Sequence, residues 1–323
     1  MSVVSKGSQA VLVEAPTAVS PRSASAKRAG QARQAYRAAA KDALLEPAAR
    51  GLFAAAATIS ILAVALICVF LFANGLPAIG QIGVVEFLGG TTWKPSSGVY
   101  GIFPMVVGSV LATGGALVIG VPVGLLTATY LSFFASPRIS RALSAGVDLL
   151  AGIPSVVFGF FGLVVIVPLV RQAFHVQGMS LLAASVVLGV MILPTIVSVS
   201  KISLDAVPAS HYEAARALGA DHERSVFTVM VPAASSGVLA AVKLGIGRAI
   251  GETMAVVMVA GNQAVVPGSP LSGVRTLTTN VVLEMGYATD LHRGALIATA
   301  VVLFVFVLLI NVTVAALKAR SAR

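Results

Sequence analysis

Long apolar stretches alternate with short polar segments along this chain. About 20 consecutive apolar residues span the hydrocarbon core of a bilayer as a helix. Stretches of sufficient length cover residues 51–73, 101–131, 149–168, 179–200, 237–260 and 294–317. The pattern predicts an all-α membrane protein with six transmembrane helices, the fifth of which carries charged residues.

The composition supports a membrane location. Of the 323 residues, 57% are hydrophobic and only 11% are charged, whereas charged residues make up about a quarter of a soluble domain. The single cysteine, Cys68, excludes an intrachain disulfide. A net charge of +10 is also found in nucleic-acid-binding proteins. Here most of it lies in the N-terminal tail and between apolar stretches, so we expect contact with membrane lipid and no nucleic acid.

The distribution of Lys and Arg predicts the orientation in the membrane. Six spans place both termini on one side, and cytoplasmic loops carry an excess of Lys and Arg. If the termini are cytoplasmic, that side holds 16 of the 22 Lys and Arg residues and the opposite side holds four. We therefore expect cytoplasmic termini, with the loops at residues 74–97 and 262–292 facing outward.

Three segments organise the chain. Residues 1–50 form a basic tail without the apolar run of a secretory signal, so we expect a cytoplasmic tail that is disordered or lies on the membrane surface, a transit peptide being the alternative. Residues 51–317 form the six-helix domain, which includes the long cytoplasmic loop 201–236. Residues 318–323 form a short basic cytoplasmic end.

Motifs for bond chemistry are not found in the sequence. No lysine follows a glycine, so the phosphate-cradling loop of an ATPase is missing. The four histidines form no His-Glu-x-x-His pair, and cysteines cannot cluster. We therefore expect a protein that is not an enzyme, has no catalytic or metal-binding residues and needs no cofactor.

The cytoplasmic loop contains signals for two short helices. Ser210 and Glu213 have the spacing of a capping box, which predicts a helix from about residue 211. Gly219 suits a left-handed helix end, Asp221 suits the start of a second helix, and Pro232 is expected to interrupt that helix. These features alone allow two interpretations: a helix that binds a cytoplasmic partner, or a simple connection between two spans.

The order of residues in this loop favours the first interpretation. The chain reads Glu213-Ala214-Ala215, three residues, Gly219, nine residues, Val229-x-Val231-Pro232. This resembles the EAA loop of the membrane subunits of ABC importers. The resemblance implies that Glu213, Ala214, Ala215, Gly219 and Pro232 couple the chain to a separate ATPase.

Two charged residues, Arg248 and Glu252, lie near the middle of the fifth apolar stretch. An ionised side chain there costs on the order of 3 kcal/mol even on the most permissive scale, so both should avoid lipid. Their spacing of four places them on one helix face, close enough to pair. The pair either fixes helix packing, or Arg248 meets an anionic substrate and Glu252 neutralises it when the site is empty.

A closer resemblance involves several segments. The chain reads GRAIGETMAV at 247–256, LAGIPSVVFG at 150–159, RTLT at 275–278 and LEMGY at 283–287. Over residues 50 to 317 it resembles the PstC-type permease subunits of phosphate-specific ABC importers. The resemblance implies the type I importer permease fold and ATP-driven import of inorganic phosphate, with a substrate path that includes Arg248, Glu252, Thr253 and Ser155.

The same resemblance implies a set of partners. These are a second homologous permease, two copies of a cytoplasmic ATPase and an external phosphate-binding protein, in a bacterial inner membrane. Two alternatives remain open: an ABC permease for another oxyanion or solute, and an ion-coupled secondary transporter, against which the EAA spacing argues.

Overall fold

The computed structural model describes residues 21–321, with side chains described for residues 49–316. The beginning of the predicted tail and the last two residues lie outside this range. The chain divides between Ile67 and Cys68 into two units, and the division falls inside α1 (Pro21–Ile82). In the first unit α1 is helical from Pro21, within the predicted tail, into the first predicted span.

The second unit contains the rest of the fold. After α1 its regular elements are α2 (Val84–Gly89), β1 (Trp93–Lys94), β2 (Val99–Tyr100), α3 (Phe103–Thr129), the π-helical η2 (Tyr130–Phe134), α4 (Pro137–Ala151), α5 (Ser155–Phe161), the π-helical η3 (Gly162–Ile166), α6 (Val167–Phe174), α7 (Leu181–Asp205), α8 (Ala209–Ala217), α9 (His222–Ser225), the π-helical η4 (Val226–Met230), α10 (Val231–Ala233), α11 (Ser235–Gly251), α12 (Met254–Val259), α13 (Leu277–Glu284) and α14 (Asp290–Ser321). A short 3-10 turn (Pro95–Ser97) joins the two antiparallel strands.

The predicted all-α membrane architecture is confirmed. Within the described residues five helical segments are long and apolar enough to span a bilayer: Ala49–Ile82, Phe103–Phe134, Ser155–Phe174, Leu181–Asp205 and Asp290–Ala316. A sixth candidate is the pair His222–Ala233 and Ser235–Gly251, which is bent by 68°. The prediction that the third span begins at residue 149 is wrong, because the helix breaks before Pro154 and α4 forms a separate helix.

Helix α7 lies at the centre of the bundle, against α3, α11 and α4. Its side chains Leu188, Met191, Ile192 and Ile196 are almost fully buried. On α3, a Cβ added at Gly120 would lie 2.7 Å from the side chain of Ile192. Close packing of α3 on α7 therefore depends on the missing side chain, as is typical where helices approach closely in a membrane.

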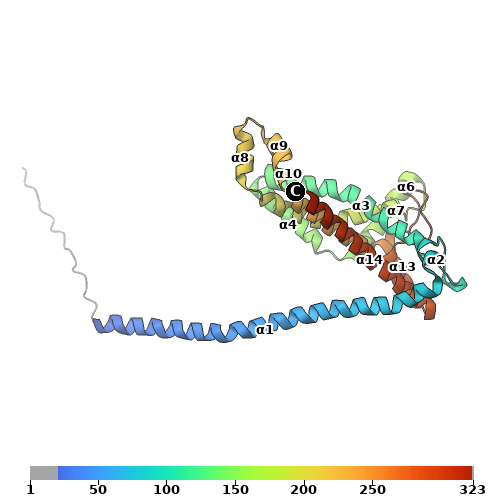
Figure 1. Ribbon diagram of the computed structural model, residues 1–323. Coiled ribbons are helices and arrows are strands. Elements are labelled where there is room, and N and C mark those ends of the chain that lie inside the picture. Colours follow the sequence, from blue (N-terminus) through green and yellow to red (C-terminus); the bar gives the residue numbers. More distant parts are fainter. Residues whose placement is uncertain (1–20, 322–323) are drawn as a thin grey trace, which may run out of the picture. The chain divides into compact units, whose positions relative to one another are not determined.

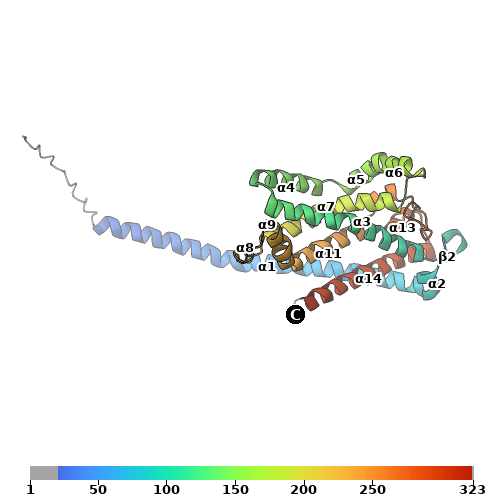
Figure 2. The same cartoon turned by 90° about the horizontal axis from the view of Figure 1, so that it is seen from above.

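The connecting segments gather at two opposite ends of the second unit (Figures 1 and 2). Helices α8 and α9 lie at one end, on the side toward which α14 finishes. Helix α2, strand β2 and the beginning of α14 lie at the other. This arrangement separates the loop 201–236 from the loops 74–97 and 262–292, as predicted from the charges. Which end faces the cytoplasm stays a prediction.

Candidate functional site

Helix α11 ends in the middle of the predicted fifth span. Gly251 is its last residue, Glu252 has extended backbone (ψ 128°), and α12 begins at Met254. The Glu252 carboxylate accepts a hydrogen bond of 3.1 Å from the backbone N–H of Ala255. The prediction of one continuous helix over residues 237–260 is therefore wrong, because Glu252 leaves α11 and satisfies an N–H in the first turn of α12.

This break separates the two charges that were expected to pair. An Arg248 Nη1–H donates to the Thr195 hydroxyl of α7 over 3.4 Å. Among the described residues no ion pair joins Arg248 to Glu252, and the spacing of four no longer places them together, because the helix ends between them. Arg248 is half-buried, and added Cβ atoms at Gly247 and Gly251 would meet no atom within 4 Å. The helix surface at these two glycines is therefore open to close approach.

Hydrogen bonds hold the broken backbone in place. The Thr253 hydroxyl donates to the carbonyl of Gly251 (3.3 Å), and the Thr278 hydroxyl of α13 donates to the carbonyl of Glu252 (3.2 Å). These bonds satisfy carbonyl groups that the end of α11 leaves without helical partners. The break is therefore a defined structure, tied to α13.

Ser155 lies at a second break. It is half-buried and is the first residue of α5, directly after Pro154. Helix α5 packs on α12, where a Cβ added at Gly159 would lie 2.8 Å from the Cα of Ala255. In the described part of the chain no hydrogen bond joins Ser155 to Arg248 or to Glu252. The structure thus places the two broken segments against each other without bringing all four expected path residues into contact.

The expected coupling residues lie on α8 and the segment after it. The predicted capping box is wrong: Pro208 is the N-cap, no side chain caps the helix, and Ser210 is already its second residue. The ring of Pro208 fixes φ at −57°, and the chain enters the helix directly after it without a hydrogen bond from a side chain. No residue of α8 is buried, and Glu213 and Ala214 are exposed.

The predicted turn between the two short helices is confirmed. Gly219 has φ +87°, and its backbone N–H donates to the carbonyl of Arg216. The Asp221 carboxylate accepts from the backbone N–H of Arg224 over 2.7 Å and caps α9. The chain needs glycine at 219 because other residues rarely adopt positive φ.

The predicted interruption at Pro232 lies elsewhere. Pro232 is in the first turn of α10, directly after the π-helical turn Val226–Met230, and the sharp bend follows Ala233. A π turn already departs from the regular hydrogen-bond pattern, so the missing N–H of proline is accommodated there.

Comparison with known proteins assigns the family. Residues 120–323 match the family described as "Binding-protein-dependent transport system inner membrane component". The chain belongs to this family. It is 39% identical over 273 residues to the "Probable ABC transporter permease protein YqgH" of Bacillus subtilis, covering 81% of this chain and 88% of that protein.

Other relatives of the chain are named as permeases of phosphate transport systems. The chain is 31% identical to the "Phosphate transport system permease protein PstC" of Mesorhizobium japonicum, over 79% of this chain and 84% of that protein. It is 32% identical to the "Phosphate transport system permease protein PstC 2" of Mycobacterium tuberculosis, over 83% and 91%. The predicted resemblance to PstC-type permeases is confirmed.

Solved structures show the same fold. The inward-facing MetNI methionine ABC transporter matches in two crystal forms, with TM-scores of 0.53 and 0.52 and 23% and 24% identity. These matches cover 72% and 69% of this chain and 100% and 94% of those chains. The chain thus has the type I ABC importer permease fold and is a multi-pass transport subunit. Such a subunit works with an ATPase and a substrate-binding protein.

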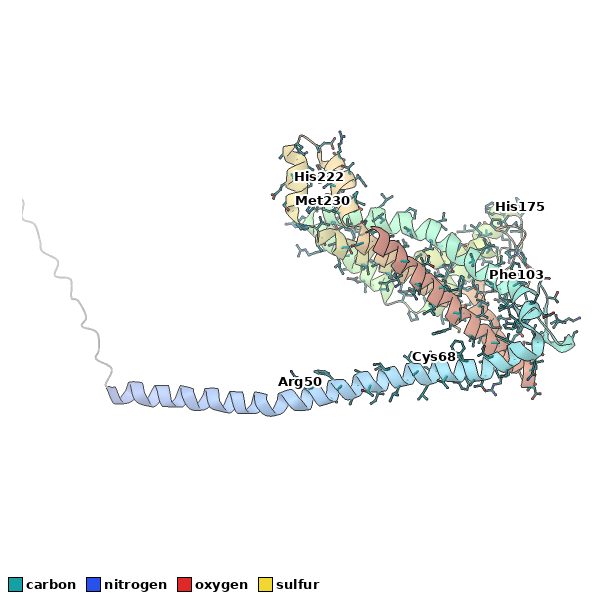
Figure 3. All side chains as sticks on the ribbon, viewed as in Figure 1. Arg50, Cys68, Phe103, His175, His222 and Met230 are labelled. Carbon is teal, nitrogen blue, oxygen red and sulfur yellow. The ribbon has the colours of Figure 1, made fainter. Side chains whose placement is uncertain are left out.

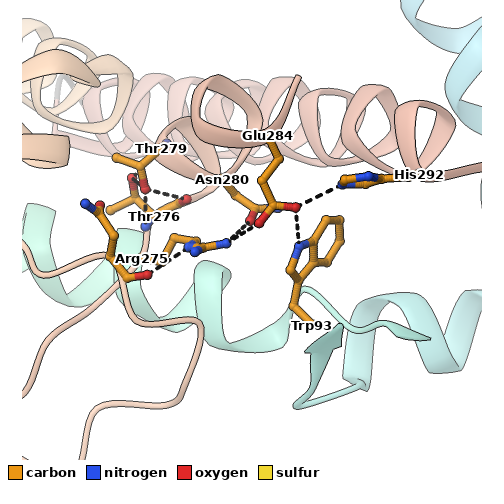
Figure 4. A network of polar contacts seen from close by, with 8 residues as sticks. Trp93, Arg275, Thr276, Thr279, Asn280, Glu284 and His292 are labelled. Atoms are coloured by element: carbon orange, nitrogen blue, oxygen red, sulfur yellow. Dashed lines mark hydrogen bonds and ion pairs between the residues drawn. The ribbon is translucent and has the colours of Figure 1, made fainter. Parts of the chain in front are cut away.

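Sequence reasoning missed a buried polar network at the end of the bundle that carries α2 (Figure 4). The Glu284 carboxylate accepts from Arg275 Nη1 (2.6 Å) and from the Trp93 indole N–H (2.9 Å), and it lies 2.9 Å from His292 Nε2. Arg275 also donates to Asn280 and to the carbonyl of Asn262. Arg275 and Glu284 lie in motifs of the family resemblance, but no spacing rule connects them to Trp93.

Leu218 was also missed. It follows α8 directly and is 90% exposed. This apolar side chain lies beside the glycine turn, next to exposed residues of α8. The sequence signal was present, since Leu218 lies inside the EAA order between Glu213 and Gly219.

Proposed function

We propose that the chain is a permease subunit of an ATP-driven importer of inorganic phosphate in a bacterial inner membrane. It pairs with a second homologous permease above two copies of a cytoplasmic ATPase, and an external phosphate-binding protein delivers the substrate. Both termini and α8 face the cytoplasm. The relatives named as phosphate transport permeases support this substrate, and the charge distribution supports this orientation.

The observation that carries the substrate assignment is the environment of Arg248. Its guanidinium is half-buried among apolar helices and has a neutral hydroxyl as its hydrogen-bond partner. A charge in such a place is costly unless an ion compensates it. The planar fork of N–H donors matches two oxygens of a phosphate, which would supply the missing negative charge.

Glu252 acts on the break between α11 and α12. Its carboxylate accepts from the first turn of α12, and its carbonyl accepts from Thr278. It therefore holds the break open next to Arg248 and does not neutralise it. Thr253, on the same break, and Ser155, on the adjacent broken segment, supply hydroxyl donors along the path.

The open face of α11 receives the second permease. Leu244, Gly247 and Gly251 are exposed and recur at helical spacing along α11, and Met254 at the start of α12 is exposed as well. Small residues at such spacing permit close approach of another helix. Two such faces would enclose a path lined by Arg248 from this chain.

Coupling to the ATPase runs through α8. The helix buries no side chain of its own, and Leu218 offers an apolar anchor beside exposed Glu213 and Ala214. A central apolar residue that enters a pocket contributes a large share of binding energy at many interfaces. Closure of the ATPase dimer on ATP would move α8 and, through the chain at either end of the loop, α7 and α11.

The test uses the complete complex in proteoliposomes, loaded with ATP and supplied with binding protein and phosphate. Arg248→Lys keeps the charge but loses the two-pronged donor, and uptake should fall at least about tenfold, because a bidentate charge-assisted contact contributes on the order of 1.5 to 3 kcal/mol. Lys243→Met on the same helix is the matched control and should retain most of the uptake. Co-purification of all subunits shows that each variant assembles.

Three outcomes would contradict the proposal. Normal phosphate uptake by assembled Arg248→Met would remove Arg248 from the path. Stronger competition by sulfate or molybdate than by unlabelled phosphate would assign another oxyanion. Uptake that follows an ion gradient without ATP would indicate a secondary transporter.

A further inference from the structure

His222 is the first residue of α9, and its ring joins three segments of the chain. Its Nδ1 lies 2.9 Å from the Tyr212 hydroxyl of α8, and its Nε2 lies 3.1 Å from the carbonyl oxygen of Phe133 in η2. Its ring also contacts the Phe134 ring edge-on, at 4.8 Å between centroids. Figure 3 shows His222 at the end of the bundle where α8 to α10 lie, far from His175.

The two partners determine which ring nitrogen carries the proton. A carbonyl oxygen can only accept, so Nε2 must carry a hydrogen and donate to Phe133. In a neutral imidazole Nδ1 then has a lone pair that accepts from the Tyr212 hydroxyl. Neutral His222 thus satisfies both contacts at once.

The Phe133 carbonyl belongs to the last turn of the α3–η2 helix. Such carbonyls have no partner within their own helix. The chain leaves the helix at Ala135, whose N–H bonds to Tyr130. His222 therefore caps the end of a transmembrane helix from a distant part of the sequence.

This contact has a mechanical consequence. Helix α8 is joined to α7 by three residues of chain, and α10 is joined to α11 through Ala234, but α3 has no direct chain connection to this loop. His222 supplies a hydrogen-bonded connection, beside the apolar contact between the Phe134 and Phe227 rings. At its other end α3 contacts α13, since Ser109 accepts from the N–H of Leu277.

We propose that His222 is a positioning residue that transmits displacement of α8 to α3, so that three helices, α3, α7 and α11, respond together to the ATPase. The proposal rests on the proposed function. Tyr212 connects His222 to α8, which moves first, and the Phe133 carbonyl connects His222 to the end of α3, which follows. Without the link, displacement of α8 reaches α3 only through the packing of α3 against α7 and α11.

The experiment measures phosphate uptake and ATP hydrolysis by the complete complex in proteoliposomes. His222→Ala should assemble and hydrolyse ATP, while phosphate moved per ATP falls about thirtyfold, the equivalent of two lost hydrogen bonds at the usual net contribution. Tyr212→Phe removes one hydroxyl and should give a smaller loss. His175→Gln, at the other end of the bundle, is the matched control and should leave the ratio unchanged.

Conservative variants separate a link from simple packing. His222→Gln can place an amide N–H where Nε2 lies and should recover much of the ratio. His222→Asn can place a carbonyl where Nδ1 lies but cannot reach Phe133, so it should recover little. Combining Tyr212→Phe with His222→Asn should cost less than the sum of the two, because both act on one connection.

Gly219→Val distinguishes failure of the inference from failure of the proposed function. A normal ratio in His222→Ala together with a reduced ratio in Gly219→Val would overturn the link and leave coupling through α8 intact. A normal ratio in both would overturn the proposed coupling itself. If His222→Ala does not assemble, Tyr212→Phe decides, and an unchanged ratio there overturns the link.

Discussion

Glu284→Gln should destabilise the buried polar network at the end of the bundle that carries α2. The Glu284 side chain is 9% exposed and faces three partners: Arg275, Trp93 and His292. Gln keeps the shape but removes the charge and replaces one acceptor oxygen with an NH₂ donor. In either amide orientation the NH₂ faces at least one group that must donate, so Arg275 or Trp93 loses its acceptor.

The magnitude follows from the burial of the pair. Removing one partner of a buried ion pair costs about 3 to 5 kcal/mol. Arg275 keeps 17% of its side chain exposed and keeps its contacts with Asn280 and Asn262, so solvent and these acceptors reduce the loss to roughly 2 to 4 kcal/mol. The midpoint of thermal unfolding should then fall by roughly 4 to 16 °C.

Trp93 provides the assay. It is the single tryptophan of the chain and donates to Glu284, so its fluorescence reports on the network directly. Unfolding of the detergent-solubilised protein is followed by tryptophan emission and by circular dichroism. Glu86→Gln, an exposed acid at the same end, should shift the midpoint by little.

The double variant Arg275→Met with Glu284→Gln tests the reasoning. It leaves no unpaired charge and should be more stable than Glu284→Gln alone, because the main cost is the stranded arginine. A Glu284→Gln midpoint within about 2 °C of the parent would refute the calculation. A double variant whose unfolding midpoint is no higher than that of Glu284→Gln would show that the network stabilises the chain through packing and not through its charges.

Two further outcomes are expected. Gly108→Ala should lower the midpoint of thermal unfolding by several degrees, because its Cβ would lie 2.4 Å from a backbone oxygen of the loop before α13. The control, Gly114→Ala on the same helix, places a Cβ where no atom lies within 4 Å and should leave the midpoint unchanged. Equal midpoints for the two variants would contradict this. In a Cys68→Ser background, a cysteine at Ser97 should react with an impermeant thiol reagent added outside intact cells and one at Ala209 should not, and the reverse labelling would invert the topology.

The sequence was sufficient for the fold class and for several of the spans. Uncharged stretches of bilayer length predicted the spans 101–131, 179–200 and 294–317, and the helices found are Phe103–Phe134, Leu181–Asp205 and Asp290–Ala316. Hydropathy works here because backbone groups in a bilayer must bond within the helix itself. Gly219 and Asp221 were equally predictable, since each has a local conformational reason to be where it is.

The errors arose where a polar side chain had more than one possible partner. Ser210 could cap a helix, but Pro208 already sets its start. Glu252 could pair with Arg248 four residues earlier, but it accepts from Ala255 three residues later. Spacing gives the distance between two residues only if the helix continues between them, and a carboxylate can itself end the helix by offering an acceptor to the next segment.

The network around Glu284 was missed for a different physical reason. Its members come from β1, the loop before α13, α13 itself and α14, so their proximity depends on how α13 packs into the bundle. The same packing directs Thr278 to the Glu252 carbonyl. One helix therefore connects the charged network at its end to the break beside Arg248 at its beginning. A disturbance of Glu284 should for this reason reach the break at Glu252 as well as lower stability.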